Sequence, residues 1–402
     1  MERKNLNLSA FEDSVEILSG LIKIESHYFN EEKIMSHVSE WTTKAGIKNE
    51  IQEYHEAKVT GFKGKNVISV LDGGKPGPTV FMNGHLDTVL LCGGWKHDPY
   101  GAQIEDGKIY GVGAVDMKGG CAAIMSALKA FVNNHKEFKG KIITSLVSDE
   151  EGPFGLGTDA VINAGLADGV DVSIVTEPSS GFTKGKFPNI CLGARGGYGI
   201  VLEFFGKSAH GANPHLGLNA AVDAGKVMTR LEDIKFKKDE HLGEGCICVV
   251  SIESDGGACS VPDYAKVKLF RHMVRGETKE TIIKELEDVI KSAGIVCKHK
   301  ISFREAPSLD TEAYLPYTVP EDDKYIKLFK ESCKSVTGED ASITYFQSIG
   351  DFNYLGTRVN APCILFGPDG DNYHSNDEYA TIDSLVKSSA ILYNYLERLL
   401  ID

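Results

Sequence analysis

Three apolar, strand-like runs in this chain each lead directly into side chains that can bind a metal or move a proton. The runs and their side chains are 79–84 with His85 and Asp87, 141–147 with Glu150 and Glu151, and 172–175 with Glu177. In open α/β sheets the ligand crevice lies at the carboxyl ends of the strands. The repetition therefore predicts that these side chains share one site.

The spacing within the first two sets indicates how the side chains divide their roles. Side chains alternate faces in an extended chain, so His85 and Asp87 point the same way. A neutral imidazole is a good zinc ligand, and a carboxylate two residues on can orient it. Glu150 and Glu151 are adjacent and project oppositely, so we expect one to ligate a metal and the other to face substrate. An exposed acidic loop is the plainer alternative for this pair.

Two further candidate ligands stand in glycine-rich segments. Asp116 follows Gly111 and Gly113 with the spacing G-x-G-x-x-D, which does not match a dinucleotide-binding fingerprint and instead predicts a tight turn at the mouth of a helix. His374 follows a strand-like run at 362–366 and a glycine-rich loop. Three carboxylates and two imidazoles suit two divalent metal ions bridged by one carboxylate, with the remaining positive charge balanced by a hydroxide.

Composition restricts the class of protein. At 402 residues the chain is too long for one ordinary core, and two domains are expected. A net charge of −14 argues against nucleic acid and anionic membrane surfaces as partners. The 9 cysteines, an odd and scattered set, indicate reduced thiols. Met1–Asn5 leads into no apolar signal segment and no run is long enough to span a bilayer, so we expect a cytoplasmic protein.

The middle of the chain predicts a self-contained ferredoxin-like domain. Its order is β-α-β-β-α-β, with strands at 197–206, 246–253, 264–273 and 295–303 and helices at 219–233 and 279–293. Thr278 and Gly294 are suitable caps for the second helix. Near the N-terminus, Ser9 and Glu12 have the spacing of a capping box.

These motifs, taken in order, resemble the dinuclear-zinc metallopeptidases that include acetylornithine deacetylase, succinyl-diaminopimelate desuccinylase, aminoacylases and glutamate carboxypeptidase. The resemblance covers nearly the whole chain. The motifs are Gly84-His85-Leu86-Asp87, Ala114-Val115-Asp116, Asp149-Glu150-Glu151, Thr176-Glu177-Pro178, Ser208-Ala209-His210 and His374-Ser375-Asn376-Asp377-Glu378.

The resemblance implies a metal set and a division of the chain. It implies two divalent ions per chain, zinc with cobalt or manganese as alternatives, held by His85, Asp116, Glu151, Glu177 and His374. Asp116 would bridge both ions, His85 and Glu177 would complete one site, and Glu151 and His374 the other. An α/β zinc-peptidase-like catalytic domain with a mixed sheet between helices (1–187 and 306–402) would carry an inserted α+β lid and dimerisation domain (188–305).

The resemblance also implies catalytic and substrate-binding residues. Glu150 would be the general base that takes a proton from the water molecule bridging the two metal ions. Asp87 would orient His85. His210 would stabilise the oxyanion from the partner subunit of a homodimer, and Arg271 would hold the substrate's carboxylate. The sequence departs from relatives around Ser260, before Arg271 and around Asp351, where the family contacts substrate.

We therefore expect a zinc-dependent hydrolase, a metallopeptidase or deacetylase type, that cleaves an amide next to a free carboxylate in an N-acyl amino acid or short peptide. An exopeptidase or dipeptidase with another end-group preference is the enzyme alternative. A catalytically silent binding protein on the same scaffold is the non-enzyme alternative, although Glu150 and all ligands are retained.

Overall fold

A computed structural model of the chain describes residues 6–401, so Met1–Asn5 lies outside the described residues. The chain forms two compact units. Unit 1 contains the described residues up to Ala194, Thr318–Phe346 and those from Gly350 on, and unit 2 contains Arg195–Tyr317 with Gln347–Ile349. Over residues 6–401, no helix has the length and apolar character needed to cross a membrane.

The boundaries between the units lie later in the chain than the sequence-based division. Residues 189–194 form strand β8, which pairs with β17 (Ser342–Phe346) in the large sheet of unit 1. On the other side, β15 (Ala313–Tyr314) still pairs with β9 (Gly196–Phe205) of unit 2. Both boundaries between the units are therefore set by which strands pair, and the composition of the sequence does not reveal this pairing.

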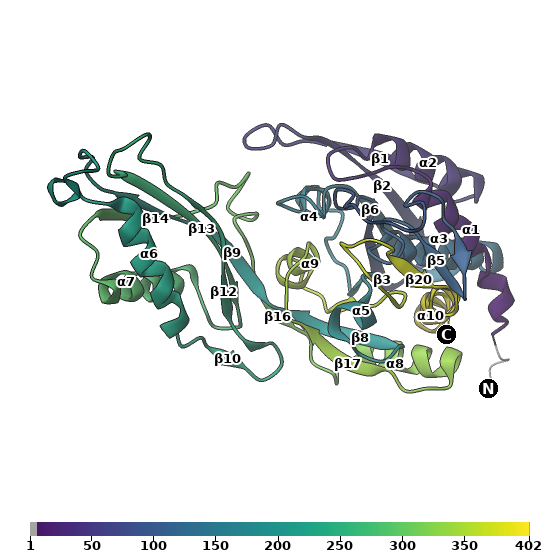
Figure 1. The fold of residues 1–402 in the computed structure, drawn as a ribbon. Coiled ribbons are helices and arrows are strands. Elements are labelled where there is room, and N and C mark those ends of the chain that lie inside the picture. Colours follow the sequence, from purple (N-terminus) through teal and green to yellow (C-terminus); the bar gives the residue numbers. More distant parts are fainter. Residues whose placement is uncertain (1–5, 402) are drawn as a thin grey trace. The chain divides into compact units, whose positions relative to one another are not determined.

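Unit 1 is an α/β unit, as predicted (Figure 1). Its helices are η1 (Leu8–Phe11), α1 (Asp13–Ile22), α2 (Glu32–Lys44), α3 (Lys118–Asn134), α4 (Leu156–Asn163), α5 (Ser179–Thr183), α8 (Lys324–Thr337), α9 (Phe352–Arg358) and α10 (Ile382–Leu400). Its other strands are β1 (Glu50–His55), β2 (Lys63–Asp72), β3 (Gly74–His85), β4 (Ile104–Glu105), β5 (Lys108–Tyr110), β6 (Phe138–Val147), β7 (Val172–Val175), β18 (Cys363–Leu365), β19 (Gly370–Asp371) and β20 (Tyr379–Thr381), with β16 (Tyr317–Thr318) at the boundary.

The large sheet of unit 1 is mixed and lies between helices. Its order is β1-β2-β6-β3-β7-β18-β8-β16, with β17 beside β8, and β6, β3, β7 and β18 run parallel. Helices α1, α3 and α10 pack against one another on one face, while α4 and α9 contact each other on the opposite face. Strands buried on both faces need continuous apolar runs, and β3 accordingly buries Val80, Phe81 and Met82 completely.

Unit 2 has the predicted ferredoxin-like order. It contains β9, α6 (Ala220–Arg230), β12 (Cys246–Glu253), β13 (Tyr264–Met273), α7 (Lys279–Ala293) and β14 (Lys298–Phe303), with η2 (Pro214–Leu216), η3 (Leu231–Asp233), β10 (Lys238–Asp239) and β11 (Gly243–Glu244) between them. The sheet order is β12-β13-β9-β14, and all of these pairs are antiparallel. The fold of this unit is therefore confirmed.

Helix caps show where local sequence signals succeed. Thr278 and Thr281 form a reciprocal capping box at the start of α7, and Gly294 ends that helix at φ 61°, as predicted. The capping box predicted at Ser9 is wrong. Asn7 instead accepts from the Ser9 N–H and caps a short 3-10 turn, so that α1 begins only at Asp13.

Helix α3 approaches β7 so closely that one of its glycines has no room for a side chain. A Cβ at Gly120 would overlap the carbonyl oxygen of Thr176, whereas Gly225 in α6 has no atom within 4 Å of a Cβ position. We expect Gly120→Ala to lower the free energy of unfolding by about 1–3 kcal/mol through overpacking. The matched control Gly225→Ala should raise it by about 0.5–1 kcal/mol. Urea unfolding measures both, and an unchanged stability of Gly120→Ala would contradict the close approach.

Candidate active site

The strand ends bring the predicted residues of unit 1 together. His85 is the last residue of β3 and pairs with Val147, the last residue of β6. On the other side of β3, Asn83 pairs with Val175 at the end of β7. Because these three strands are parallel and in step, the segments that follow them emerge at one edge of the sheet.

Asp116 lies between the two histidines and gives one oxygen to each. His85 Nε2 lies 3.3 Å from Asp116 Oδ1, and His374 Nε2 lies 3.4 Å from Asp116 Oδ2. Around His85, the Glu177 Oε1 and Glu150 Oε2 atoms are each 3.8 Å from Nε2. Around His374, Glu151 Oε1 is 3.0 Å from Nε2. The site therefore has two halves that share one carboxylate.

The backbone fixes the tautomer of His85. Its Nδ1 lies 3.0 Å from the backbone carbonyl oxygen of Asp87, which can only accept a hydrogen bond. Nδ1 therefore carries a proton and turns Nε2 toward Asp116 and Glu177. The sequence predicted that the Asp87 carboxylate orients His85. The shorter contact comes from the Asp87 backbone carbonyl, and the carboxylate Oδ1 lies 3.6 Å from Nδ1.

The Asp87 carboxylate holds the neighbouring segment instead. The N–H groups of Glu150 and Glu151 donate to its Oδ1 and Oδ2 at 3.1 and 2.9 Å. Glu150 is held from another side, because the N–H of Asp351 donates to its Oε1 at 3.0 Å. These bonds fix two adjacent glutamates that point in different directions, Glu150 toward His85 and Glu151 toward His374.

Burial makes the charged form of the cluster's carboxylates costly, which favours a bound cation. Burial is the largest cause that raises the pKa values of Glu150 and Glu177 well above the ordinary range, and the pKa of Glu151 to about 7. Hydrogen bonds to Asp116 and Glu151 raise the pKa of His374 to about 11. The Glu177 Oε2 atom is buried and has no hydrogen-bond partner among residues 6–401.

This donor set fits divalent cations. Two groups have ligand atoms mutually within 4.8 Å, His85 with Glu150 and Glu177, and His85 with Asp116 and Glu151. Mixed nitrogen and oxygen donors of this kind suit zinc. A cation would compensate the buried carboxylates and would give the unpartnered Glu177 oxygen a bonding partner.

Glu378 is a residue that the sequence analysis quoted in a motif but gave no role. Its buried carboxylate accepts the N–H groups of Gly113, Val115 and Asp116 at 2.8, 2.9 and 3.0 Å. The turn that presents Asp116 is thus wrapped around one carboxylate. The sequence did contain one indication of this role. Glu378 lies four residues after His374, on the loop that must reach the same site.

The other predicted site residues lie elsewhere or are turned away. His210 and Ser260 are in unit 2, where they form a backbone bridge to each other. The His210 Nδ1 accepts the N–H of Ala212 at 3.1 Å, which leaves Nε2 as the protonated, donating nitrogen. The Asp351 carboxylate is buried against Thr158 and Asn83, and it is the backbone N–H of Asp351 that bonds to Glu150.

The substrate role that the resemblance implied for Arg271 does not fit the geometry. Its side chain is 0 % exposed and donates to Glu285 at 2.9 and 3.0 Å and to Glu277 at 2.6 Å. The guanidinium also lies over the ring of Phe236 at 4.5 Å. Arg271 therefore belongs to the interior of unit 2.

The fold and the site define a metal-dependent hydrolase. The family model described as peptidase family M20/M25/M40 matches residues 81–398, and the chain belongs to this family. The resemblance found in the sequence is thus confirmed.

Relatives extend over almost the whole chain. A succinyl-diaminopimelate desuccinylase of Orientia tsutsugamushi (strain Boryong) is 27% identical over 388 residues, which is 95% of each chain. Among solved structures, a tripeptidase from Staphylococcus aureus matches with a TM-score of 0.79 at 20% identity, over 98% of this chain and 99% of that one. A dinuclear metal-binding peptidase of the same family from Bacillus subtilis matches with a TM-score of 0.73 at 13% identity, over 98% and 99%.

The hydrogen bonds to the Glu378 carboxylate lead to a prediction about metal affinity. Glu378→Gln keeps the shape but puts an amide NH₂ group against backbone donors, which should loosen the Asp116 turn. Since Asp116 serves both halves of the site, we expect affinity for both ions to fall by about 10–100-fold. Titration against a competing chelator measures this. Asp383→Asn, at an exposed carboxylate paired with Lys387, is the control and should change nothing. Unaltered affinity in Glu378→Gln would show that the turn is held by other contacts.

Proposed function

We propose that this enzyme hydrolyses the amide bond of an N-acyl amino acid that carries a free carboxylate, with two zinc ions per chain, or cobalt or manganese in their place. The observation that carries the proposal is the placement of Asp116, whose two oxygens each face one histidine of a two-part cluster. His85 and Glu177 would hold one ion, Glu151 and His374 the other, and Asp116 both. The ions would polarise the amide carbonyl and lower the pKa of a water molecule.

The name of the curated relatives supports the choice of acyl group. Several of the matched relatives are named as desuccinylases, so an N-succinyl amino acid is the substrate class that we propose. Location in the cytoplasm and assembly as a homodimer through unit 2 belong to the same proposal.

Glu150 is the proposed general base. It borders the His85 half of the cluster. Its N–H donates to the Asp87 carboxylate, and its own carboxylate accepts the N–H of Asp351. Its carboxylate would accept a proton from the attacking water and return it to the amine nitrogen as the amide bond breaks. The Nε2–H of His210 would donate to the carbonyl oxygen as negative charge develops there.

A substrate panel tests the proposed reaction. The zinc-loaded protein should hydrolyse N-succinyl amino acids with a higher kcat/KM than N-acetyl amino acids or dipeptides. Removal of metal with a chelator should abolish the activity, and added zinc should restore it. Hydrolysis of dipeptides alone would contradict the proposed substrate class and would favour a peptidase.

The adjacent glutamates can be separated by matched substitutions. Glu150→Gln should retain both metal ions but lower kcat by about 10²–10⁴, because only the proton acceptor is lost. Glu151→Gln should instead lose metal from the His374 half. Elemental analysis and steady-state kinetics on both variants decide the assignment, and the opposite pattern would exchange the two roles.

Mixed dimers test whether His210 acts across the subunit interface. A dimer of one His210→Ala chain and one Glu150→Gln chain should recover about half the native activity, since one site then has both groups intact. The reciprocal control pairs a native chain with a chain carrying both substitutions. That dimer should be inactive if His210 acts across the interface and half-active if it acts within its own chain.

A further inference from the structure

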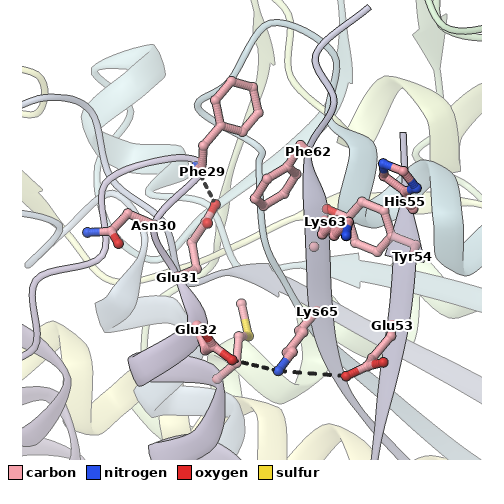
Figure 2. A pocket seen from close by; sticks show the side chains of 12 residues that line it. Phe29, Asn30, Glu31, Glu32, Glu53, Tyr54, His55, Phe62, Lys63 and Lys65 are labelled. Carbon is pink, nitrogen blue, oxygen red and sulfur yellow. Dashed lines mark hydrogen bonds and ion pairs between the residues drawn. The ribbon is translucent and has the colours of Figure 1, made fainter. Parts of the chain in front are cut away.

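Unit 1 contains a pocket that is separate from the metal cluster. It has a volume of about 580 Å³ and lies between the start of α2 and strands β1 and β2 (Figure 2). Its lining includes Phe29, Glu31, Tyr54, Phe62 and Lys65 and none of the five proposed metal ligands.

Aromatic rings form one side of this pocket. The ring centroids of Phe29 and Phe62 are 4.8 Å apart, and Tyr54 meets Phe62 edge-on at 5.9 Å. Figure 2 shows the rings of Phe29 and Phe62 next to each other in the same lining as the Glu31 carboxylate. Rings arranged around an open volume can present their negative faces to a cation.

Phe29 is held in an unusual conformation. The residue is 39% exposed, and its backbone has φ 67°, a region that bulky residues rarely adopt. The Phe29 N–H donates to Glu31 Oε1 at 3.0 Å, which stabilises this turn. An exposed aromatic ring on a strained backbone is typical of a ligand clamp.

Glu31 supplies a buried carboxyl group that can ionise when a cation binds beside it. Its side chain is 3% exposed, and its Oε1 also accepts the N–H of Asp149 at 3.0 Å. Its Oε2 is buried and has no hydrogen-bond partner within residues 6–401. Among the lining cations, Lys65 is already bound to Glu32 at 2.8 Å and lies 3.7 Å from Glu53. Burial, followed by the charge of Asp87, raises the pKa of Glu31 to about 8, so the group is largely protonated at neutral pH and would ionise fully beside a bound cation.

We propose that this pocket is a second ligand site that takes a small organic cation, an alkylammonium group whose charge lies against the rings of Phe29, Tyr54 and Phe62 near Glu31. A cation would gain from the ring faces and from the buried carboxylate together. A neutral molecule of the same shape would gain only from apolar contact. Because Glu31 also holds the N–H of Asp149, the ligand would lie next to the segment that carries Glu150.

The test compares choline with its neutral carbon isostere, 3,3-dimethylbutan-1-ol, on the full-length, zinc-loaded protein. Dissociation constants from isothermal titration calorimetry or ligand-observed NMR should favour choline by roughly tenfold. Glu31→Gln, which removes only the charge, should abolish most of this preference.

Two further variants keep the test decisive if Glu31→Gln does not fold. Phe29→Leu changes an exposed side chain and Phe62→Leu a neighbouring one, and each should weaken choline binding by roughly fivefold without affecting the isostere. Phe205→Leu, at an exposed ring that contacts Tyr264 in unit 2, is the matched control and should leave binding unchanged. Equal affinity for the two probes, or choline binding that none of the pocket variants alters, would overturn the proposal.

Discussion

The structure depends on keeping several carboxylates and the His85 imidazole close together and away from water, with the half-exposed His374 at the edge of the cluster. Carboxylates in such a place lose hydration and repel one another, so they are stable only when cations or hydrogen-bond donors compensate them. Asp116 shows the arrangement most directly, with one oxygen toward His85 and the other toward His374. A cation bound in the same cluster would give the unpartnered Glu177 oxygen a partner.

Hydrogen bonds from backbone N–H groups to buried carboxylates hold the cluster in shape. Glu378 accepts three such bonds from the Asp116 turn, Asp87 accepts two from Glu150 and Glu151, and Glu31 accepts one from Asp149. Two residues in these segments, Asp149 and His374, have left-handed φ values of 59° and 58°. Such conformations persist only where surrounding contacts impose them, which agrees with a site built for function.

Features that follow from a repeated residue pattern could be predicted from the sequence. Features that depend on a single hydrogen bond could not. The strand ends that carry His85, Glu150 and Glu177 could be located because buried parallel strands are continuous apolar runs. The roles of Glu378 and of the Asp87 carboxylate could not be predicted, since a hydrogen bond from a backbone N–H can involve any residue type and has no sequence pattern. For Arg271 the signal existed but was overlooked. Arg271 lies on the same face of β13 as Leu269 and Met273, since they are two residues before and after it. Both of these are buried in the core of unit 2.

A crystal structure of the zinc-reconstituted protein, with anomalous diffraction measured at the zinc absorption edge, tests the central claim most directly. We predict two anomalous peaks on either side of the Asp116 carboxylate, one bound by His85 and Glu177 and the other by His374 and Glu151. A single peak, or peaks that Asp116 does not join, would contradict a two-metal site built around that carboxylate.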